Sequence, residues 1–164
     1  MPPGLHRASL RVFAWLPPRA RRVAVRLIAP SFTVGAMCLI ERADGRVLLA
    51  RQVYRERWGV PGGLLDRGEP ATTAARREIL EEVGLEVELL GEPAVVVDPQ
   101  TRRVDLIYRA RPCREEDADS VTPTSPEISA TAWFGPDALP ELQPETVQAL
   151  TTLARLATPG HAGP

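Results

Sequence analysis

One short amphipathic segment constrains the fold of this chain more than any other feature. Pro70 suits a first helical position and Gly84 suits a left-handed cap, so the sequence predicts a helix over residues 70–83. A helical wheel places three glutamates within an arc of roughly 100°; they are Glu78, Glu81 and Glu82. The adjoining arc is apolar and consists of Ala75, Ile79 and Val83. The segment therefore predicts a helix that buries one edge and presents a row of carboxylates beside it.

The crowded carboxylates favour a metal site. Like charges four residues apart on a helix repel each other by roughly 0.2–0.5 kcal/mol per pair, and a divalent cation that binds the oxygens removes this repulsion. A solvated acidic surface is the simpler explanation for any one pair of glutamates. Two further features favour the metal: a glycine-rich loop before the helix lets backbone approach a ligand, and Arg77 can bridge the carboxylates.

Few other residue types in the chain can carry chemistry. The only histidines, His6 and His161, lie near the two termini, so a serine or cysteine nucleophile has no well-placed base. Two cysteines, Cys38 and Cys113, are too few and too far apart for a zinc site or a disulfide framework. Carboxylates, arginines and a metal are therefore expected to carry the chemistry.

The remaining elements predict a layered α/β domain. Strands are expected at residues 33–40, 47–50, 86–90, 94–97, 104–110 and 128–134. Asp44 and Gly45 predict a hairpin that joins the first two strands, whereas proline and paired glycines predict irregular structure over 60–63. A last helix is expected over 144–157, with one apolar face formed by Val147, Leu150, Leu153 and Leu156.

The acidic helix and the loop before it resemble a Nudix box. That pattern reads glycine, five residues, glutamate, seven residues, arginine-glutamate, an aliphatic, any residue, two glutamates, any residue, glycine and an aliphatic. Every specified position is filled, by Gly63, Glu69, Arg77, Glu78, Ile79, Glu81, Glu82, Gly84 and Leu85. The resemblance extends to residues 58–63 before the box and to 133–134 and 138–140 after it.

The resemblance to Nudix hydrolases implies a fold and a reaction. The fold would be an α/β/α sandwich with a mixed β-sheet between helices, over residues 31–158. The reaction would be cleavage of a diphosphate bond in a nucleoside diphosphate derivative by a metal-activated water, with Mg²⁺ as cofactor and Mn²⁺ as the alternative. A catalyst for this bond must neutralise charge, align the bond and supply an ionised water, all of which bound metals can do.

Residue roles follow from the same resemblance. Metal ligands would be Glu78, Glu82, Glu81 and a carbonyl of Gly63 or Gly62. Glu81 would be either a further ligand or the group that activates the water. Arg77 would orient the acids, and Glu69 would support them. The expected catalytic set is Glu78, Glu81, Arg77 and an acid from outside the box.

The best candidate for that outside acid is Glu127, at the start of the last predicted strand. Its competitors are the acids of loop 112–126: Glu115, Glu116, Asp117 and Asp119. Arg51 is a candidate phosphate contact, although a surface ion pair explains it equally well. Tyr54, Trp58 and Tyr108 are candidates for stacking on a base, with core packing favoured for Trp58 and Tyr108.

Substrate specificity is expected to depend on loops 52–57 and 112–126, whose conformation the sequence does not predict. The substrate therefore stays open among ADP-ribose, oxidised nucleoside triphosphates, dinucleoside polyphosphates, sugar nucleotides and capped RNA. The alternative to an enzyme is a sensor domain that binds a nucleotide without turnover. Such proteins commonly have a damaged box, so the complete box favours the enzyme.

Residues 1–30 form a basic arm, expected to contain two helical pieces separated by Pro17 and Pro18. Six arginines precede the first acidic residue, Glu41, yet packing of the arm on the domain or on a second copy, as a homodimer, is favoured over nucleic acid binding. No apolar run is long enough to span a bilayer. The arm has the composition of a transit peptide, but the lack of lysine and asparagine favours a cytoplasmic protein of a GC-rich bacterium. Residues 159–164 are expected to be a flexible tail.

Overall fold

The computed structural model describes residues 15, 17–29 and 31–157. The chain divides into two units between Phe32 and Thr33. The first unit contains helix α2 (Pro18–Ile28), which begins directly after Pro17. The helical piece expected before Pro17 and the tail after residue 158 lie outside the described residues. In the described part of the chain, no helix has the length and apolar character needed to cross a membrane.

The second unit is built on two sheets. A mixed sheet has the strand order β3-β1-β5-β4, with β1 (Thr33–Ile40) parallel to β5 (Arg103–Pro112). Strands β3 (Gly62–Leu64) and β4 (Val87–Asp98) pair antiparallel to these. Strands β2 (Val47–Gln52) and β6 (Ile128–Phe134) form a separate antiparallel pair.

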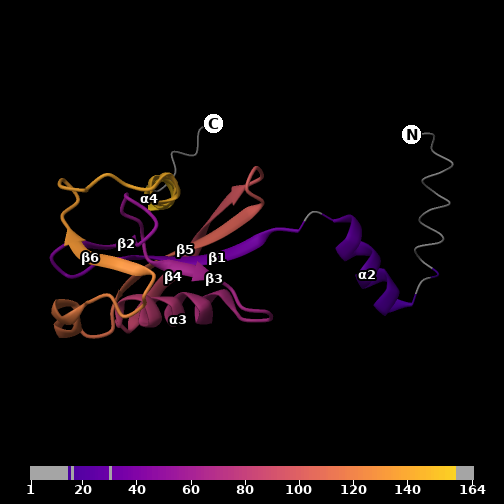
Figure 1. Cartoon of the computed structure of the whole chain (residues 1–164), viewed down its shortest axis with the longest axis horizontal. Coiled ribbons are helices and arrows are strands. Elements are labelled where there is room, and N and C mark those ends of the chain that lie inside the picture. Colours follow the sequence, from indigo (N-terminus) through magenta and orange to yellow (C-terminus); the bar gives the residue numbers. More distant parts are fainter. Residues whose placement is uncertain (1–14, 16, 30, 158–164) are drawn as a thin grey trace. The chain divides into compact units, whose positions relative to one another are not determined.

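Helices cover both faces of the sheet (Figure 1): α3 (Ala71–Val83) lies on one face and α4 (Pro144–Ala157) on the other. Successive side chains of β1 point alternately to the two faces of the sheet and contribute to both cores. Ala36, Cys38 and Ile40 belong to the core beneath α3, whereas Met37 and Leu39 belong to the core beneath α4. The expected α/β/α sandwich with a mixed sheet is confirmed.

The helix of the box forms where its sequence predicts it. Gly84 adopts a left-handed conformation (φ 68°, ψ 22°), and its N–H donates to the Leu80 carbonyl at 3.1 Å. Ile79 and Val83 are buried as expected. Pro70 is the capping residue before the helix rather than its first residue, because its ψ of 140° is extended.

Three strand predictions are corrected by pairings that are distant in sequence. Residues 62–64 form β3, since pairing with β1 overrides the local preference of glycine for irregular structure. Strand β2 pairs with β6 instead of forming a regular hairpin with β1, although Gly45 makes the expected turn (φ 80°). The two short strands predicted over 86–97 are one strand, β4, with an irregular register between Leu90 and Ala94.

The buried face of α4 also differs from the prediction. Val147 and Leu156 are exposed, whereas Thr146, Ala149 and Leu153 are buried. Two of the residues that the helix buries, Thr146 and Ala149, have small side chains, so a spacing of large apolar residues alone did not identify the face.

Candidate functional site

Arg77 organises the acids of the box. Its guanidinium donates two hydrogen bonds to Glu69, from Nε and Nη2, each at 2.9 Å. Nη1 donates to Glu78 at 2.8 Å and to Glu81 at 3.2 Å, and Nη2 also reaches the Leu64 carbonyl at 3.2 Å. These hydrogen bonds lower the pKa of Glu69 to about 2. A single arginine thus fixes the loop and the helix of the box relative to each other.

The other side of the acidic row touches the paired glycines. The Gly62 N–H donates to Glu82 Oε2 at 2.8 Å. A Cβ added to Gly63 would lie 2.5 Å from the Glu78 carboxyl carbon, so this carboxylate packs directly against the glycine backbone. The close approach of Glu78 explains glycine at position 63, whereas at position 62 a Cβ would meet the backbone of Ala36 and Met37 in β1, and φ is +140°.

Four successive residues, 59–62, are each held by a different element. Gly59 exchanges hydrogen bonds of 2.8 and 2.9 Å with Ala50 of β2, and the Val60 N–H donates to Thr146 Oγ1 of α4 at 3.1 Å. The Pro61 carbonyl accepts from Cys38 of β1 at 3.0 Å, and Gly62 is held by Glu82 of α3. This segment fixes the position of the backbone next to the acids.

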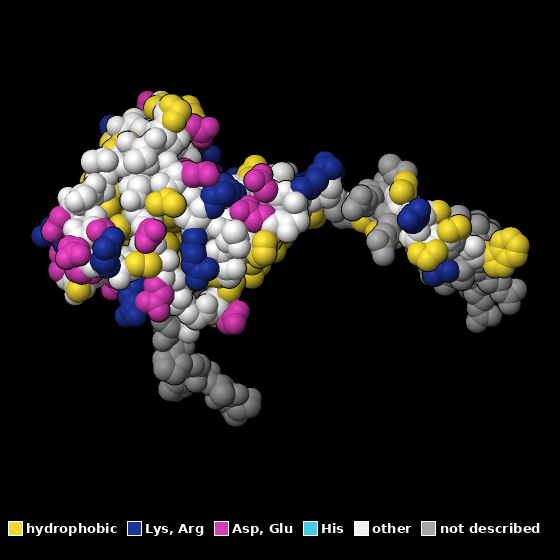
Figure 2. Space-filling view, turned by 90° about the horizontal axis from the view of Figure 1, so that it is seen from below, with side chains coloured by type: hydrophobic (Ala, Val, Ile, Leu, Met, Phe, Trp, Pro, Cys, Tyr) yellow, Lys and Arg dark blue, Asp and Glu magenta, His cyan; other side chains and the backbone are white. Residues whose placement is uncertain are grey.

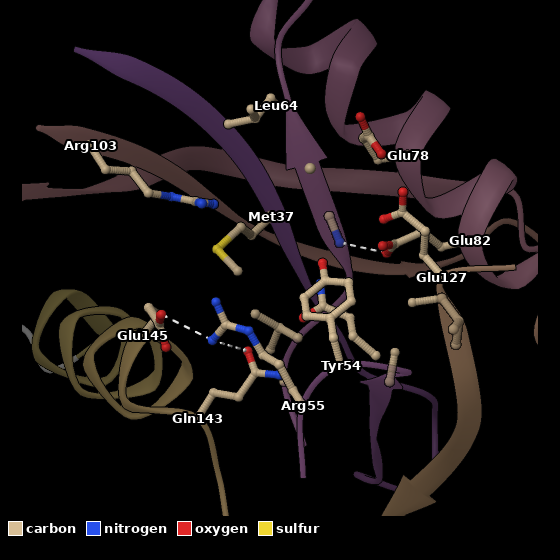
Figure 3. Close-up of a pocket in the computed structure, with 17 residues that line it drawn as sticks. Met37, Tyr54, Arg55, Leu64, Glu78, Glu82, Arg103, Glu127, Gln143 and Glu145 are labelled. Atoms are coloured by element: carbon tan, nitrogen blue, oxygen red, sulfur yellow. Dashed lines mark hydrogen bonds and ion pairs between the residues drawn. The ribbon is translucent and has the colours of Figure 1, made fainter. Parts of the chain in front are cut away.

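A cavity of about 390 Å³ opens beside this segment. Glu78, Glu82 and Glu127 line one side of it, so α3 and the start of β6 bring acids from distant parts of the chain together (Figure 3). The Glu127 carbonyl accepts from the Val53 N–H at 2.8 Å, which ties this residue to the end of β2. The candidate acid from outside the box therefore lies with the box acids.

Glu82 is the acid of the site whose pKa is raised by its surroundings. Its side chain is buried, and burial raises its pKa to about 7, opposed by the Gly62 N–H and reinforced by the negative charges of Glu78 and Glu127. A carboxylate without water around it and next to two like charges is costly to ionise. A cation between these acids would offset that cost.

Other predicted residues lie elsewhere. Glu81 is exposed and contacts Arg77, but it does not line the cavity. Loop 112–126, expected to shape specificity, contains the short helix η1 (Glu115–Ser120), and its acids do not line the cavity either. Two of them, Glu115 and Asp119, pair with Arg42.

The aromatic candidates divide between core and cavity. Trp58 packs edge-on against Phe134 with ring centroids 5.0 Å apart, and Tyr108 is buried, as the core interpretation expected. Arg51 lies over the Trp58 ring at 5.3 Å. Tyr54 is exposed and lines the cavity.

Sequence reasoning missed the cavity wall formed by Arg55, Arg103, Gln143 and Glu145. Arg55 belongs to the predicted specificity loop 52–57, which signalled its region but not its partners. Those partners, Gln143 and Glu145, lie 88 and 90 positions away in sequence. No local pattern connects residues at that separation.

Comparisons with known proteins agree with this site. The model of the NUDIX domain family matches residues 31–156. A MutT-like protein of Streptomyces ambofaciens is 32% identical over 116 residues, covering 71% of this chain and 72% of the relative. An RNA pyrophosphohydrolase of Caulobacter vibrioides is 35% identical over 120 residues, covering 60% and 69%. The crystal structure of a MutT NUDIX hydrolase from Burkholderia pseudomallei is similar with a TM-score of 0.62 and 32% identity, over 76% of this chain and 99% of that one. With a complete box on α3 and a family match over most of its length, the chain belongs to the NUDIX domain family and is a Nudix hydrolase.

Proposed function

We propose that this enzyme cleaves the diphosphate bond of a nucleoside diphosphate derivative with Mg²⁺ held by Glu78 and Glu82. The observation that carries the proposal is the convergence of three carboxylates, from Glu78, Glu82 and Glu127, on one cavity next to the paired glycines. Mn²⁺, which takes the same oxygen ligands, is the alternative ion.

The acids fit a hard divalent cation that is shared with a substrate. Among the residues that the structure describes, no three acidic, histidine or cysteine side chains form a ready-made metal cluster. Mg²⁺ is usually held by one or two carboxylates together with phosphate oxygens, rather than by a cage of protein ligands. Two box acids at the edge of an open cavity match that mode of binding.

A backbone carbonyl next to the acids is a further oxygen donor, and the register favours Gly62 over Gly63. Gly63 pairs with Ala36, and the flanking hydrogen bonds, from Cys38 to Pro61 and from Leu65 to Val34, turn odd-numbered residues toward β1. Gly62 turns its backbone the other way, as its N–H bond to Glu82 indicates. We therefore assign the donor role to Gly62.

The chain's own groups supply position and a base. A bound divalent cation would offset phosphate charge and lower the pKa of the attacking water. Arg77 keeps the carboxylate of Glu78 oriented through a charge-assisted hydrogen bond of 2.8 Å. Glu127 lines the cavity on the same side as Glu78 and Glu82, where it can accept the proton of a water held near Glu82. We assign the base to Glu127 in preference to Glu81, because Glu81 lies outside the cavity lining.

The test is an assay of the full chain against ADP-ribose, a sugar nucleotide, a dinucleoside polyphosphate, nucleoside triphosphates and RNA with a 5′-triphosphate. Release of nucleotide or phosphate is measured with Mg²⁺, with Mn²⁺ and with a chelator. Turnover of at least one substrate that stops in chelator is expected, and metal-independent turnover would contradict the proposal.

The base assignment has its own comparison. Glu127→Gln should lower kcat by about 100-fold or more, which is typical for loss of a general base, with little change in KM. Glu81→Gln is the matched control and should keep most of the activity. A larger loss in Glu81→Gln would place the base on α3 instead.

RNA is a second candidate substrate, since one relative is an RNA pyrophosphohydrolase. On the face of the molecule in Figure 2, arginine and acidic side chains of the second unit alternate, which does not favour a long nucleic acid track there. We therefore favour a small nucleotide. A salt titration of duplex and single-stranded RNA binding tests this choice, because phosphate contacts weaken steeply with salt. Homodimer formation through residues 1–30 and a cytoplasmic location stay predictions.

A further inference from the structure

The cavity extends from the box acids to a second polar wall that diphosphate cleavage does not require. Arg55 lies at the centre of this wall and donates from Nη1 to Gln143 Oε1 at 3.3 Å and to Glu145 Oε1 at 3.1 Å. Figure 3 shows these three residues across the cavity from Glu78 and Glu82. Gln143 is itself anchored, because its Nε2 donates to the Arg57 carbonyl at 3.1 Å. These hydrogen bonds connect the three side chains to one another and to the backbone, and the Arg55 and Glu145 side chains are 39% and 43% exposed to the cavity and solvent.

Two acceptor oxygens of residues that line this cavity have no donor. Among the described residues, Gln52 Oε1 and Glu145 Oε2 are the buried side-chain nitrogen and oxygen atoms without a hydrogen-bond partner, and both residues line this cavity. A buried polar atom left unpaired is unfavourable, so each of these oxygens favours a ligand that donates to it. Since Arg55 already occupies Oε1 of Glu145, its second oxygen is left for another donor. The terminal torsions of glutamate and glutamine are broad, so a small rotation presents these oxygens to the cavity.

The rest of the lining suits a flat ring. Tyr54 presents an aromatic side chain that is 65% exposed, and Met37 and Ile128 supply apolar surface. An aromatic face with apolar surroundings favours stacking by a planar heterocycle, whereas a sugar would leave this surface unmatched.

We infer that this wall is a nucleobase subsite that selects bases carrying an exocyclic amino group. Gln52 and Glu145 would accept hydrogen bonds from the two N–H groups of this amino group, and Arg55 would position Glu145. Cytosine, adenine and guanine carry such a donor. Uracil presents a carbonyl oxygen where cytosine has its amino group, and this oxygen would face the carboxylate and repel it. Hypoxanthine has only a C–H where guanine has its amino group, so it offers no donor there. The inference rests on the proposed function only in that the base belongs to the nucleotide being cleaved.

The test uses two matched pairs of substrates that differ at this group: cytidine against uridine derivatives, and guanosine against inosine derivatives, with the same diphosphate group. The wild-type kcat/KM should favour the amino member of each pair by about tenfold or more, as expected for one unmet hydrogen bond in a buried site. Glu145→Gln leaves an oxygen for Arg55 and turns an amide N–H toward the cavity. This variant should abolish or invert both preferences, mainly through KM, while kcat for the better substrate changes little.

Glu141→Gln is the matched control. Glu141 pairs with Arg57 at 2.6 Å and does not line the cavity, so both preferences should stay at their wild-type values. Wild-type preferences near unity, or preferences that Glu145→Gln leaves unchanged, would overturn the inference while diphosphate cleavage still stands.

A binding measurement separates failure of this inference from failure of the proposed reaction. Calorimetric titration of the metal-free protein with the four nucleoside 5′-monophosphates needs no turnover. It should show the same order, with cytidine and guanosine forms tighter than uridine and inosine forms. Equal affinities for both members of each pair would overturn the subsite even if the protein hydrolysed none of the derivatives.

Discussion

Replacing Glu82 by glutamine should stabilise the metal-free protein at alkaline pH while it removes the metal-dependent activity. The substitution keeps the volume of the side chain and an oxygen that can accept from the Gly62 N–H. It removes the charge, which in the absence of metal is the unfavourable part of this buried group. The wild type and the variant should therefore differ in opposite senses for folding and for catalysis.

The size of the folding effect follows from the shift in pKa. Burial raises the pKa of Glu82 from 4.5 to about 7, so between these values the folded chain binds the proton more tightly than the unfolded chain. The free energy of unfolding must fall as pH rises through this window, and the full penalty is present above pH 7. At about 1.36 kcal/mol for each pKa unit, the penalty is at most roughly 3 kcal/mol.

Urea unfolding in chelator, at about pH 4.5 and about pH 8.5, measures this difference. Glu82→Gln should match the wild type at the lower pH and exceed it at the higher. Glu81→Gln is the control: its side chain is 59% exposed, so its difference from the wild type should not grow with pH. A Glu82→Gln protein that is no more stable than the wild type at pH 8.5 would refute the reasoning. In turnover assays with saturating Mg²⁺, wild-type-like rates in the variant would refute the assignment of Glu82 as a ligand.

Two further substitutions probe how the acids are held. Arg77→Lys cannot reproduce the paired hydrogen bonds to Glu69 and the one to Glu78. The kcat/KM in Mg²⁺ should therefore fall by about 10–100-fold, as for loss of a group that orients a metal ligand. An unchanged kcat/KM would mean that these hydrogen bonds are dispensable. Gly63→Ala places a methyl group 2.5 Å from the Glu78 carboxyl carbon, which must move. The Mg²⁺ concentration needed for half-maximal activity should rise, whereas Gly135→Ala, with open space around its Cβ position and no positive φ, should leave it unchanged.

The box could be predicted from the sequence because its signals are local. Spacing along one helix determines which carboxylates share a face, and Gly84 caps that helix through its own backbone conformation. Glu127 was identified from its place at the start of a predicted strand, and the structure places it with the box acids. The bounds of β1 and β6 agree with the predicted strands at 33–40 and 128–134.

Features that depend on distant pairing were not predictable. Residues 62–64 have a sequence that disfavours a strand, and only their pairing with β1 makes them one. Strand β2 leaves the turn at Gly45 to pair with β6, some 80 positions later in the chain, as the Leu49–Ala132 partnership illustrates. The Arg55–Glu145 contact likewise joins a loop to a helix 90 positions later, and no local pattern predicts that connection.

Because residues 59–62 are attached to four elements, the position of the backbone next to the acids depends on the packing of the whole second unit. The Val60 N–H is bonded to a hydroxyl on α4, while two residues later the Gly62 N–H is bonded to a carboxylate on α3, on the opposite face of the sheet. Loosening of either helical layer would be transmitted through three peptide units to the acids. Thr146 lines no part of the cavity and does not contact Glu78 or Glu82. A substitution at this buried position is nevertheless expected to alter cation affinity, because its hydroxyl holds Val60.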